Sequence, residues 1–464
     1  MRRIAYSVLG TAVVVTTLAA CTDFLTGEGV TDDPNFPTGA TRDQLFVAIQ
    51  ASQFAQLEGS LALLSCMYVQ HCSGTTNFVQ EWDVYNITAE ETDANFVGVY
   101  TGGGLVDIRA LQASAEAEGD DVYLGIAKVW EAIAVSFGAD NWGDIPYSEA
   151  IGDFATPVFD DQMAIYAGLQ TLLDEAIADL GGTTPGPGLV DLIYDGDKAK
   201  WIRAAYTLKA RLHMHTAERL GTPAYTAAIA AASQGILLPA DDFTTRHGTE
   251  SSERNMWNQF QGTSFGPYAV AGRRLVDLMV ARNDPRLPAY FGDADAGTPG
   301  VQYSGRDVTA GDPGNGSPLS GTRITNPAFR QPILTADETE LILAEAKFRT
   351  TGAATAAPHL NTVRQRYGQG TIGTPTLNDI MTEKYIAMFQ NIEAWQDYKR
   401  TCLPVLTPVA PATEVPGRVY YGTTEGTANP NTPTTASELS NGGIAHDRPG
   451  VGGFRNANDP TRCP

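Results

Sequence analysis

The sequence has 464 residues and a formal net charge of −22, from 31 Lys and Arg against 53 Asp and Glu. Hydrophobic residues make up 43% of it, so wholesale disorder is excluded and the chain is long enough to bury a large core. An acidic surface repels phosphates, which makes nucleic acid and anionic lipid poor partners for the folded part.

The N-terminus carries the most specific signal in the chain. A basic start, Met1-Arg2-Arg3, is followed by an apolar run that ends in Leu18-Ala19-Ala20-Cys21. The run predicts a secretory signal peptide, because it is short for a membrane-spanning helix; a single-pass anchor helix is the alternative. Its end resembles the lipobox of bacterial lipoproteins, so we expect removal of residues 1–20, acylation of Cys21 and membrane anchoring through the lipid. Residues 21–40 are expected to form a tether.

Apart from Cys21, the chain has four cysteines, and an even number favours disulfide pairing in an oxidising compartment. Proximity in the sequence favours the pairs Cys66–Cys72 and Cys402–Cys463, although four cysteines allow three connectivities. A metal site built with His71 lacks the paired ligand spacings of structural zinc, so none is expected there.

Apolar residues recur at helical spacing in five segments, which predicts a mainly α-helical chain. The segments begin near Asp120, Asp160, Asp197, Thr335 and Thr376. The second ends at Gly181-Gly182, and the fourth opens with the capping-box sequence Thr335-Ala336-Asp337-Glu338. The fifth is expected to be one long helix that buries the side chains from Met381 to Trp395.

Two long stretches show no clear periodicity, residues 241–330 and residues 401–464. Loops of such length inside a folded protein are usually functional or disordered. We therefore expect a helical scaffold, formed by residues 41–240 and 331–400, that carries these two loop-rich segments. The length allows about three domains or a single large unit.

Motifs that suggest catalysis or metal binding lack the surroundings that this chemistry needs. Gly262-Thr263-Ser264-Phe265-Gly266 matches G-x-S-x-G, but the preceding residues are too polar for the buried strand of a nucleophile elbow. His213 and His215 would point to different faces of one helix, so they cannot readily share a metal. Asp293 and Asp295 could hold a weak structural calcium ion, although a solvated turn is favoured. Neither a catalytic residue nor a cofactor is otherwise expected.

Aromatic residues in polar, loop-like segments are the remaining candidates for ligand binding. Aromatic rings stack on the apolar faces of sugar rings, while neighbouring amide, guanidinium and carboxylate groups bind hydroxyl groups. The alternative is that the rings pin the loops onto the helical core. The predicted ligand-binding set is Trp82, Tyr85, Asn77, Glu81, Arg254, Trp257, Asn258, Phe265, Tyr268 and Tyr303.

Several segments, taken in order, resemble the SusD/RagB family of surface lipoproteins. The first is Trp142-Gly143-Asp144-Ile145-Pro146-Tyr147-Ser148-Glu149-Ala150, which is similar to the family's GDIPYxEA turn. The others are Asp160 to Leu180, Asp197 to Arg211, Leu341 to Ala346, Glu383 to Arg400 and Pro416 to Asn429. Together with the lipobox, the resemblance runs from Cys21 to about Asn429, which is nearly the whole mature chain.

The resemblance implies a single domain over residues 21–464, built as a superhelix of TPR-like helix pairs whose intervening loops form the ligand site and face a transporter. It implies a non-catalytic outer-membrane lipoprotein, facing the cell exterior, that captures an oligosaccharide or, as the less favoured ligand, a peptide. The implied partner is a SusC-like TonB-dependent transporter, over which the lipoprotein acts as a lid. A peptide-binding adaptor of TPR-like type and a lipid-anchored glycan hydrolase remain as alternatives.

Overall fold

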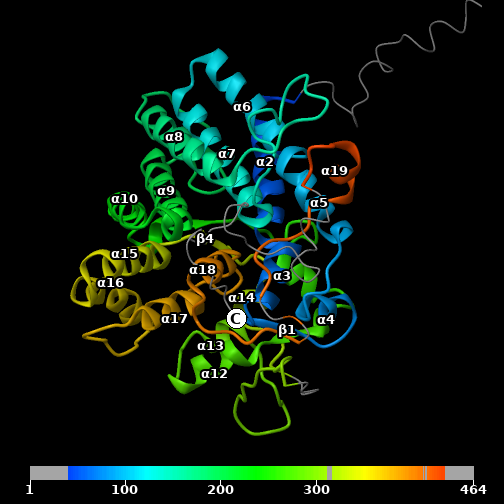
Figure 1. Cartoon of the computed structure of the whole chain (residues 1–464), viewed down its shortest axis with the longest axis vertical. Coiled ribbons are helices and arrows are strands. Elements are labelled where there is room, and N and C mark those ends of the chain that lie inside the picture. Colours follow the sequence, from blue (N-terminus) through cyan, green and yellow to red (C-terminus); the bar gives the residue numbers. More distant parts are fainter. Residues whose placement is uncertain (1–39, 311–315, 411, 413–414, 434–464) are drawn as a thin grey trace, which may run out of the picture. The chain divides into compact units, whose positions relative to one another are not determined.

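The computed structural model describes residues 40–310, 316–410, 412 and 415–433 (Figure 1). The chain divides into two units, residues 1–45 and residues 46–464, and the fold described below is that of the second unit. The signal peptide, Cys21 and Cys463 lie outside the described residues, as does the predicted tether except for Ala40.

The described residues are mainly helical, which confirms the predicted fold class. The longer helices are α2 (Arg42–Glu58), α3 (Ser60–Tyr68), α5 (Ala89–Tyr100), α6 (Leu105–Glu118), α7 (Asp121–Trp142), α8 (Gln162–Leu180), α9 (Lys198–Leu220), α10 (Thr222–Ala232), α12 (Arg273–Ala281), α15 (Ala336–Thr351), α16 (Ala353–Arg366), α17 (Leu377–Ala387) and α18 (Glu393–Thr401). The shorter ones are α4 (Asn77–Asp83), α11 (Met256–Gln261), α13 (Leu287–Tyr290), α14 (Thr322–Thr325) and α19 (Thr423–Ala428). The strands of the described part form two antiparallel pairs, β1 (Cys72–Gly74) with β3 (Ala269–Ala271) and β2 (Phe243–Thr244) with β4 (Pro332–Leu334).

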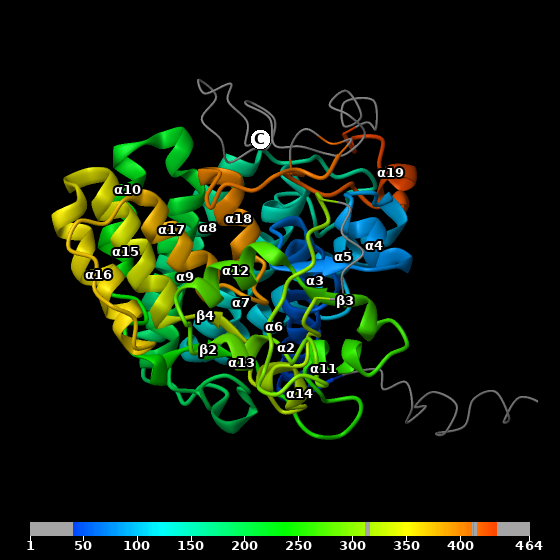
Figure 2. The same ribbon diagram turned by 90° about the horizontal axis from the view of Figure 1, so that it is seen from below.

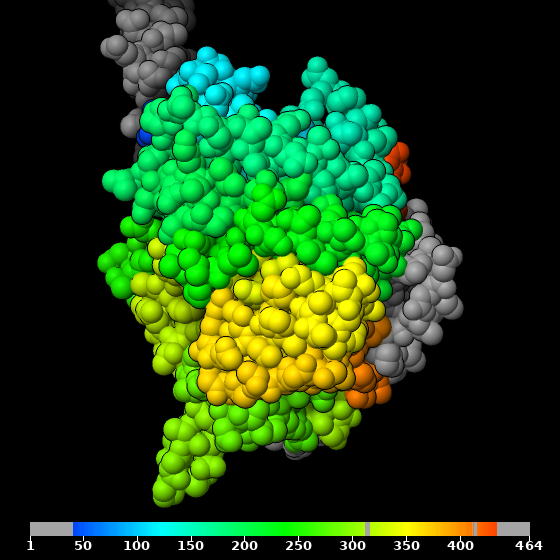
Figure 3. Space-filling view, turned by 90° about the vertical axis from the view of Figure 1, so that its left-hand side faces the viewer, coloured from blue at the N-terminus to red at the C-terminus, as the bar shows by residue number. Residues whose placement is uncertain are grey.

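Helices that follow one another in the sequence pack against each other. Helix α6 packs on α7, α7 on α8, α9 on α10, and α15 on α16. Helices α8, α9, α10, α15 and α16 lie on the left-hand side of Figure 1, and Figure 2 shows the same ribbon from below. Figure 3 shows the face on that side of the molecule. Helix α10 also packs on α15, so the helices before and after residues 241–330 join into one array. The array agrees with the expected series of TPR-like helix pairs.

Helix α7 packs against α5, α6, α8 and α9 and is buried along almost its whole length. Its first turn is capped by Asp120, whose Oδ1 accepts a hydrogen bond from the backbone N–H of Tyr123 at 3.1 Å. Of the described helices, α7 alone is long and apolar enough to cross a membrane. Most of that stretch is buried inside the protein, as in the core helix of a globular fold.

The predicted helix start at Thr335 is present, but only half of the predicted capping box forms. Thr335 Oγ1 accepts a hydrogen bond from the backbone N–H of Glu338 at 3.1 Å. The carboxylate of Glu338 is instead held by Arg211, whose Nε and Nη2 lie 2.6 and 2.7 Å from its two oxygens. The carboxylate of Glu338 therefore forms a buried, bidentate ion pair with Arg211. It does not accept the hydrogen bond from the backbone N–H of Thr335 that would complete a capping box.

The prediction of one long helix from Thr376 is wrong, because the chain turns between α17 and α18. Gln390 in this turn has φ +68°, which a continuous helix cannot accommodate. Asn391 stabilises the break: its Oδ1 accepts from the backbone N–H of Glu393 at 3.0 Å, and its Nδ2 donates to the carbonyl oxygen of Ile333 at 3.1 Å. The apolar pattern nevertheless continues across the turn, since Trp395 is fully buried.

The stretch predicted as loop-rich over residues 241–330 contains several short elements. Helices α11, α12, α13 and α14 fall in it, and they are only four to nine residues long. Such lengths give at most about two and a half helical turns, too few to establish a 3.6-residue period in the sequence.

Charged side chains fill the buried junction of α9, α15, α17 and α18. Arg400 lies between Glu345, at 2.5 Å, and Asp397, at 2.6 Å. Asp397 also accepts from Lys384 Nζ at 2.8 Å. His215 contacts Asp140 through Nδ1 and Glu393 through Nε2, both at 3.1 Å, while His213 is only half-buried. The two histidines therefore lie in different surroundings, as expected from their spacing.

Because His215 lies in this junction, we expect the stability of the protein to decrease as pH rises. Burial alone would lower the pKa of His215, but the carboxylates of Asp140 and Glu393 outweigh it and raise the pKa to about 9. An unfolded histidine has a pKa of about 6.5, so the folded state is favoured below that pH and loses this contribution as pH rises to about 9. Urea unfolding at several pH values should show a falling free energy of unfolding over this window. The difference between the wild type and His215→Gln isolates the histidine, and a difference that is constant with pH would contradict the assignment.

Candidate ligand-binding site

Two segments far apart in the sequence meet where β1 pairs with β3. Cys72 lies opposite Ala271 and Gly74 opposite Ala269. Beyond the strands, the backbone N–H of Thr75 donates to the carbonyl oxygen of Tyr268 at 2.8 Å. Helix α4 follows β1 and helix α11 precedes β3, and both contact the short 3-10 turn Gly266–Tyr268. The strand pair therefore brings these two helices into one region.

An open pocket of about 350 Å³ lies between α4, α11 and the junction of α2 with α3. It is lined mostly by apolar and aromatic side chains. The lining residues are Glu58, Gly59, Ser60, Leu63, Phe78, Trp82, Met256, Trp257, Gln259, Phe260 and Thr263. At the junction, a side chain on Gly59 would collide with the carbonyl oxygen of Ala55, so the tight turn requires glycine. We call this the tryptophan pocket.

A row of aromatic rings extends from the tryptophan pocket. The ring centroid of Phe78 lies 4.9 Å from that of Trp82 and 5.1 Å from that of Phe265. Phe265 in turn lies 6.3 Å from Tyr268, and all three contacts are edge-to-face. Edge-to-face contacts hold the rings in a fixed arrangement.

Two contacts fix the position of α4 and of its tryptophan. Trp82 Nε1 donates to Glu91 Oε1 at 2.7 Å, so the indole N–H is satisfied within the protein. On the neighbouring residue, the carboxylate of Asp83 accepts from Ser73 Oγ at 2.6 Å and pairs with Arg306 Nη1 at 2.9 Å. Burial raises the pKa of Asp83 to about 7, although Ser73 and Arg306 favour its charged form. Helix α4 is thereby tied to β1 and to α5.

Four of the predicted ligand-binding residues come together here. Trp82 and Trp257 line the tryptophan pocket, and Phe265 and Tyr268 belong to the ring row. Contrary to the prediction, the two tryptophans lie on short helices, α4 and α11, rather than in loops. Trp82 is 8% exposed and Trp257 is 2% exposed, so much of each ring also packs on the core.

The other six predicted residues do not line the tryptophan pocket. Tyr85 is fully buried and packs edge-to-face on Tyr68 at 5.4 Å. The polar side chains bind nearby groups instead: Asn77 accepts from Phe78 N, Glu81 from Asn86 Nδ2, and Arg254 and Asn258 donate to the carbonyl oxygens of Thr249 and Ile324. Tyr303 is half-buried near Asp293. These four polar side chains thus bind other groups of the protein and do not line the pocket.

Phe78, Met256 and Glu58 are pocket residues that the sequence pattern does not single out. Phe78 stands four residues before Trp82, and Met256 four residues before Phe260. This i, i+4 spacing places both side chains of a pair on one helix face. The spacing would have been informative if the short helices had been recognised, whereas no local signal marks Glu58.

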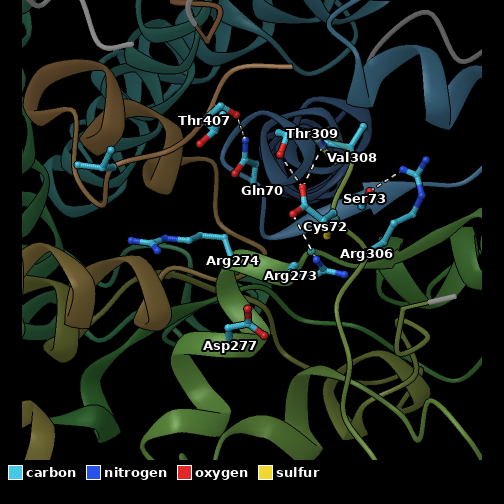
Figure 4. A pocket seen from close by; sticks show the side chains of 13 residues that line it. Gln70, Cys72, Ser73, Arg273, Arg274, Asp277, Arg306, Val308, Thr309 and Thr407 are labelled. Carbon is cyan, nitrogen blue, oxygen red and sulfur yellow. Dashed lines mark hydrogen bonds and ion pairs between the residues drawn. The ribbon is translucent and has the colours of Figure 1, made fainter. Parts of the chain in front are cut away.

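A second pocket, of about 220 Å³, lies beside β1 and the start of α12 (Figure 4). Three arginines line it, but two of them are paired with carboxylates. Arg273 Nη1 lies 3.3 Å from Asp307 Oδ2, and Arg306 is held by Asp83. Figure 4 shows Arg306 directed toward Ser73 and Arg274 directed to the opposite side. The arginines therefore do not converge on one anion, and the tryptophan pocket is the better candidate site.

Cys66 and Cys72 form a disulfide, as their proximity in the sequence predicts, with Cα atoms 5.2 Å apart. The bond joins the last turn of α3 to β1, the strand from which α4 leads into the tryptophan pocket. Cys402 is also disulfide-bonded. Its predicted partner, Cys463, lies outside the described residues.

The described part of the chain contains no cluster of three or more His, Cys, Asp or Glu residues that could hold a metal ion. Asp293 Oδ1 accepts from the backbone N–H groups of Asp295 and Gln302, and Asp295 accepts from Thr298 Oγ1 at 2.5 Å. The turn proposed for calcium is thus closed by its own hydrogen bonds. Ser264 follows helix α11 rather than a strand, so its motif does not form a nucleophile elbow.

The fold and the sequence are both similar to those of known proteins. A SusD-like family, described as "Starch-binding associating with outer membrane", matches residues 34–422. No curated protein matches the chain. A chitin-binding SusD homolog from Flavobacterium johnsoniae is 21% identical with a TM-score of 0.70, over 89% of this chain and 96% of the homolog.

Two further solved structures show the same fold. A SusD/RagB family protein from Bacteroides thetaiotaomicron is 21% identical with a TM-score of 0.69, over 88% of this chain and 98% of its own. A SusD homolog from Bacteroides fragilis is 19% identical with a TM-score of 0.71, over 90% of this chain and 100% of its own. Since the family match covers most of the sequence and the helical array agrees with these structures, the chain belongs to the SusD-like family of outer-membrane-associated proteins.

Proposed function

We propose that this protein captures an oligosaccharide in the tryptophan pocket and delivers it to a transporter without chemical change. The observation that carries the proposal is the convergence of Trp82 and Trp257, from distant parts of the chain, on one open and largely apolar pocket. A pyranose chain presents apolar C–H faces at regular intervals, which match aromatic rings set in a row. The row from Trp82 through Phe78 to Phe265 provides such a surface.

The comparisons support a glycan as the ligand class. The family is described as starch-binding, and one similar structure is that of a chitin-binding homolog. Both polymers are chains of glucose-type pyranoses, so they share the apolar ring faces that the pocket suits. A peptide remains the less favoured ligand, because the described lining offers few polar groups for a peptide backbone.

The number of acidic side chains in the pocket favours a binding role over hydrolysis. Glycoside hydrolysis generally uses two carboxyl groups that flank the scissile bond. Glu58 is the one acidic side chain among the described residues that line the tryptophan pocket. In the proposed role, the protein therefore holds its ligand and leaves the glycosidic bonds intact.

The proposed place of action is the outer membrane, with the protein anchored through acylated Cys21 and facing the cell exterior. The lipobox-like sequence before Cys21 and the outer-membrane association of the family support this location. A SusC-like TonB-dependent transporter is the proposed partner, which would receive the ligand while this protein covers its mouth as a lid.

Calorimetric titration of the purified protein with maltohexaose, chitohexaose and a peptide of similar length tests the ligand class. We expect saturable binding of at least one sugar and no increase in reducing ends after prolonged incubation. Binding of the peptide alone would favour the adaptor, and release of reducing ends would favour the hydrolase. Purification from gently solubilised membranes should also recover a TonB-dependent barrel in a near-equal amount; its absence would contradict the proposed delivery.

A further inference from the structure

We infer that Glu58 is a positioning residue, whose buried carboxylate holds α11 and Trp257 against the opposite wall of the tryptophan pocket. The inference concerns how the pocket is built, and only its ligand-binding readout rests on the proposed function.

The carboxylate of Glu58 is buried and both of its oxygens are engaged. The side chain of Glu58 has no exposed area, and Nε2 of His247 lies 2.9 Å from its Oε1. Asn255 Nδ2 donates to Oε2 at 3.1 Å. A carboxylate with no exposed area and a protein group on each oxygen is not available to the hydroxyl groups of a ligand, although Glu58 lines the pocket. Its role is therefore to hold protein groups.

Asn255 passes this constraint to the tryptophan. It is the N-cap of α11, and its Oδ1 accepts a hydrogen bond from the backbone N–H of Trp257 at 3.0 Å. Its own backbone N–H donates to the carbonyl oxygen of Pro327 at 2.8 Å. The side-chain amide thus joins Glu58, at the end of α2, to the first turn of α11. Helix α11 has only six residues, so its first turn determines where Trp257 lies.

His247 extends the same constraint to the segment that leads into α11. Its Nδ1 lies 3.2 Å from the carbonyl oxygen of Glu253, two residues before Asn255, and its Nε2 also lies 3.0 Å from Thr245 Oγ1. The ring packs on Phe54 of α2, with centroids 6.0 Å apart. One carboxylate therefore fixes both the cap of α11 and the segment before it.

The geometry points to a pocket formed before the ligand arrives. Its first wall is the α2–α3 junction, which contains Glu58 and Gly59, and its second wall is α11. A preformed pocket avoids the ordering of side chains and loops on binding, and this raises affinity without any new contact to the ligand. Loss of the Glu58 contacts should weaken binding even though the aromatic rings remain in the sequence.

Substitution at Glu58 in the full-length protein tests the inference. Glu58→Leu keeps the size but removes both contacts, and we expect affinity for maltohexaose or chitohexaose to fall by about tenfold or more. Glu58→Gln can accept from Asn255 and donate to a neutral His247, so it should restore affinity to within about threefold of the wild type. Asn255→Asp keeps the cap of α11 but places two carboxylates together, so it should weaken binding as Glu58→Leu does.

Glu131→Leu is the matched control. Glu131 is a buried carboxylate of α7 that accepts hydrogen bonds from Arg109, Gln112 and Tyr147, and none of these residues lines the tryptophan pocket. It should leave affinity unchanged. Wild-type affinity in folded Glu58→Leu and Asn255→Asp would overturn the inference, as would an equal loss of affinity in Glu131→Leu.

A measurement without ligand separates this inference from the proposed function. Hydrogen exchange of the α11 amides should be faster in Glu58→Leu and Asn255→Asp than in the wild type and Glu58→Gln. If the wild type binds neither sugar, the proposed function fails, and the exchange rates alone decide whether Glu58 holds α11. Unchanged exchange in both variants would then overturn the inference.

Discussion

Replacing Trp82 by alanine is expected to weaken oligosaccharide binding by about thirtyfold, the usual effect of truncating an aromatic residue at the centre of a binding site. Trp82 lines the tryptophan pocket and also begins the ring row through Phe78, so its loss removes the first stacking surface and loosens the next ring. Trp82→Phe should retain a stacking face and lose much less affinity. Calorimetry with maltohexaose and chitohexaose measures the change.

Phe154→Ala provides the control for this substitution. Phe154 is an aromatic side chain that is 52% exposed and does not line the tryptophan pocket, so its removal should leave affinity unchanged. Circular dichroism should show the same helical content in all three variants. If Trp82→Ala unfolds the protein, or if it folds and binds as tightly as the wild type, Trp82 is a core residue and the site assignment is wrong.

Replacing Arg400 by methionine is expected to lower the free energy of unfolding by about 3–5 kcal/mol, which is typical when one partner of a buried ion pair is removed. Arg400 is the shared partner of Glu345 and Asp397, and all three side chains are buried. Without the guanidinium, Glu345 is left as an uncompensated charge inside the protein. Urea unfolding followed by circular dichroism measures the loss.

An exposed ion pair supplies the comparison. Arg349 lies 3.4 Å from Glu218, and their side chains are 30% and 22% exposed. Solvent screens such a pair, so Arg349→Ala should cost less than about 1 kcal/mol. If Arg400→Met and Arg349→Ala lowered the free energy of unfolding equally, the ion pairs of the buried junction of α9, α15, α17 and α18 would stabilise the protein no more than a solvent-screened pair.

Sequence periodicity located α7, α8, α9 and α15, but it did not locate α2. The difference lies in the polar residues of its buried face. Gln50 and Gln53 are buried, and each donates a hydrogen bond of 3.0 Å to a backbone carbonyl, of Val190 and Gly103 respectively. Glutamines on the inward face interrupt the apolar stripe by which a helix is recognised in the sequence. Only the tertiary structure shows that each of these glutamines has a backbone carbonyl as its hydrogen-bond acceptor.

The lining of the tryptophan pocket, the proposed binding site, was predictable in its tryptophans but not in its polar residues. Trp82 and Trp257 stand out because large rings in polar segments need an explanation, and both line the tryptophan pocket. Glu81 and Arg254, chosen as their sequence neighbours, bind local groups instead. Glu58 could not be found this way, since its partners His247 and Asn255 are nearly 200 residues away. Proximity in the sequence says little about which polar group a buried residue will meet.

The pairing of β1 with β3 also constrains the order in which the protein can acquire its activity. Thr75 and Tyr268, joined just beyond the strands, are 193 residues apart. Contacts of such long range are expected to form more slowly than those within local helices, because closing a long loop costs entropy that local helices do not pay. A chain truncated after α10 would contain helices α2 to α10 but would lack α11, and so it would have only one side of the tryptophan pocket. Ligand binding at the proposed site is therefore an assay of complete folding, and a partly folded molecule would be inert rather than weakly active.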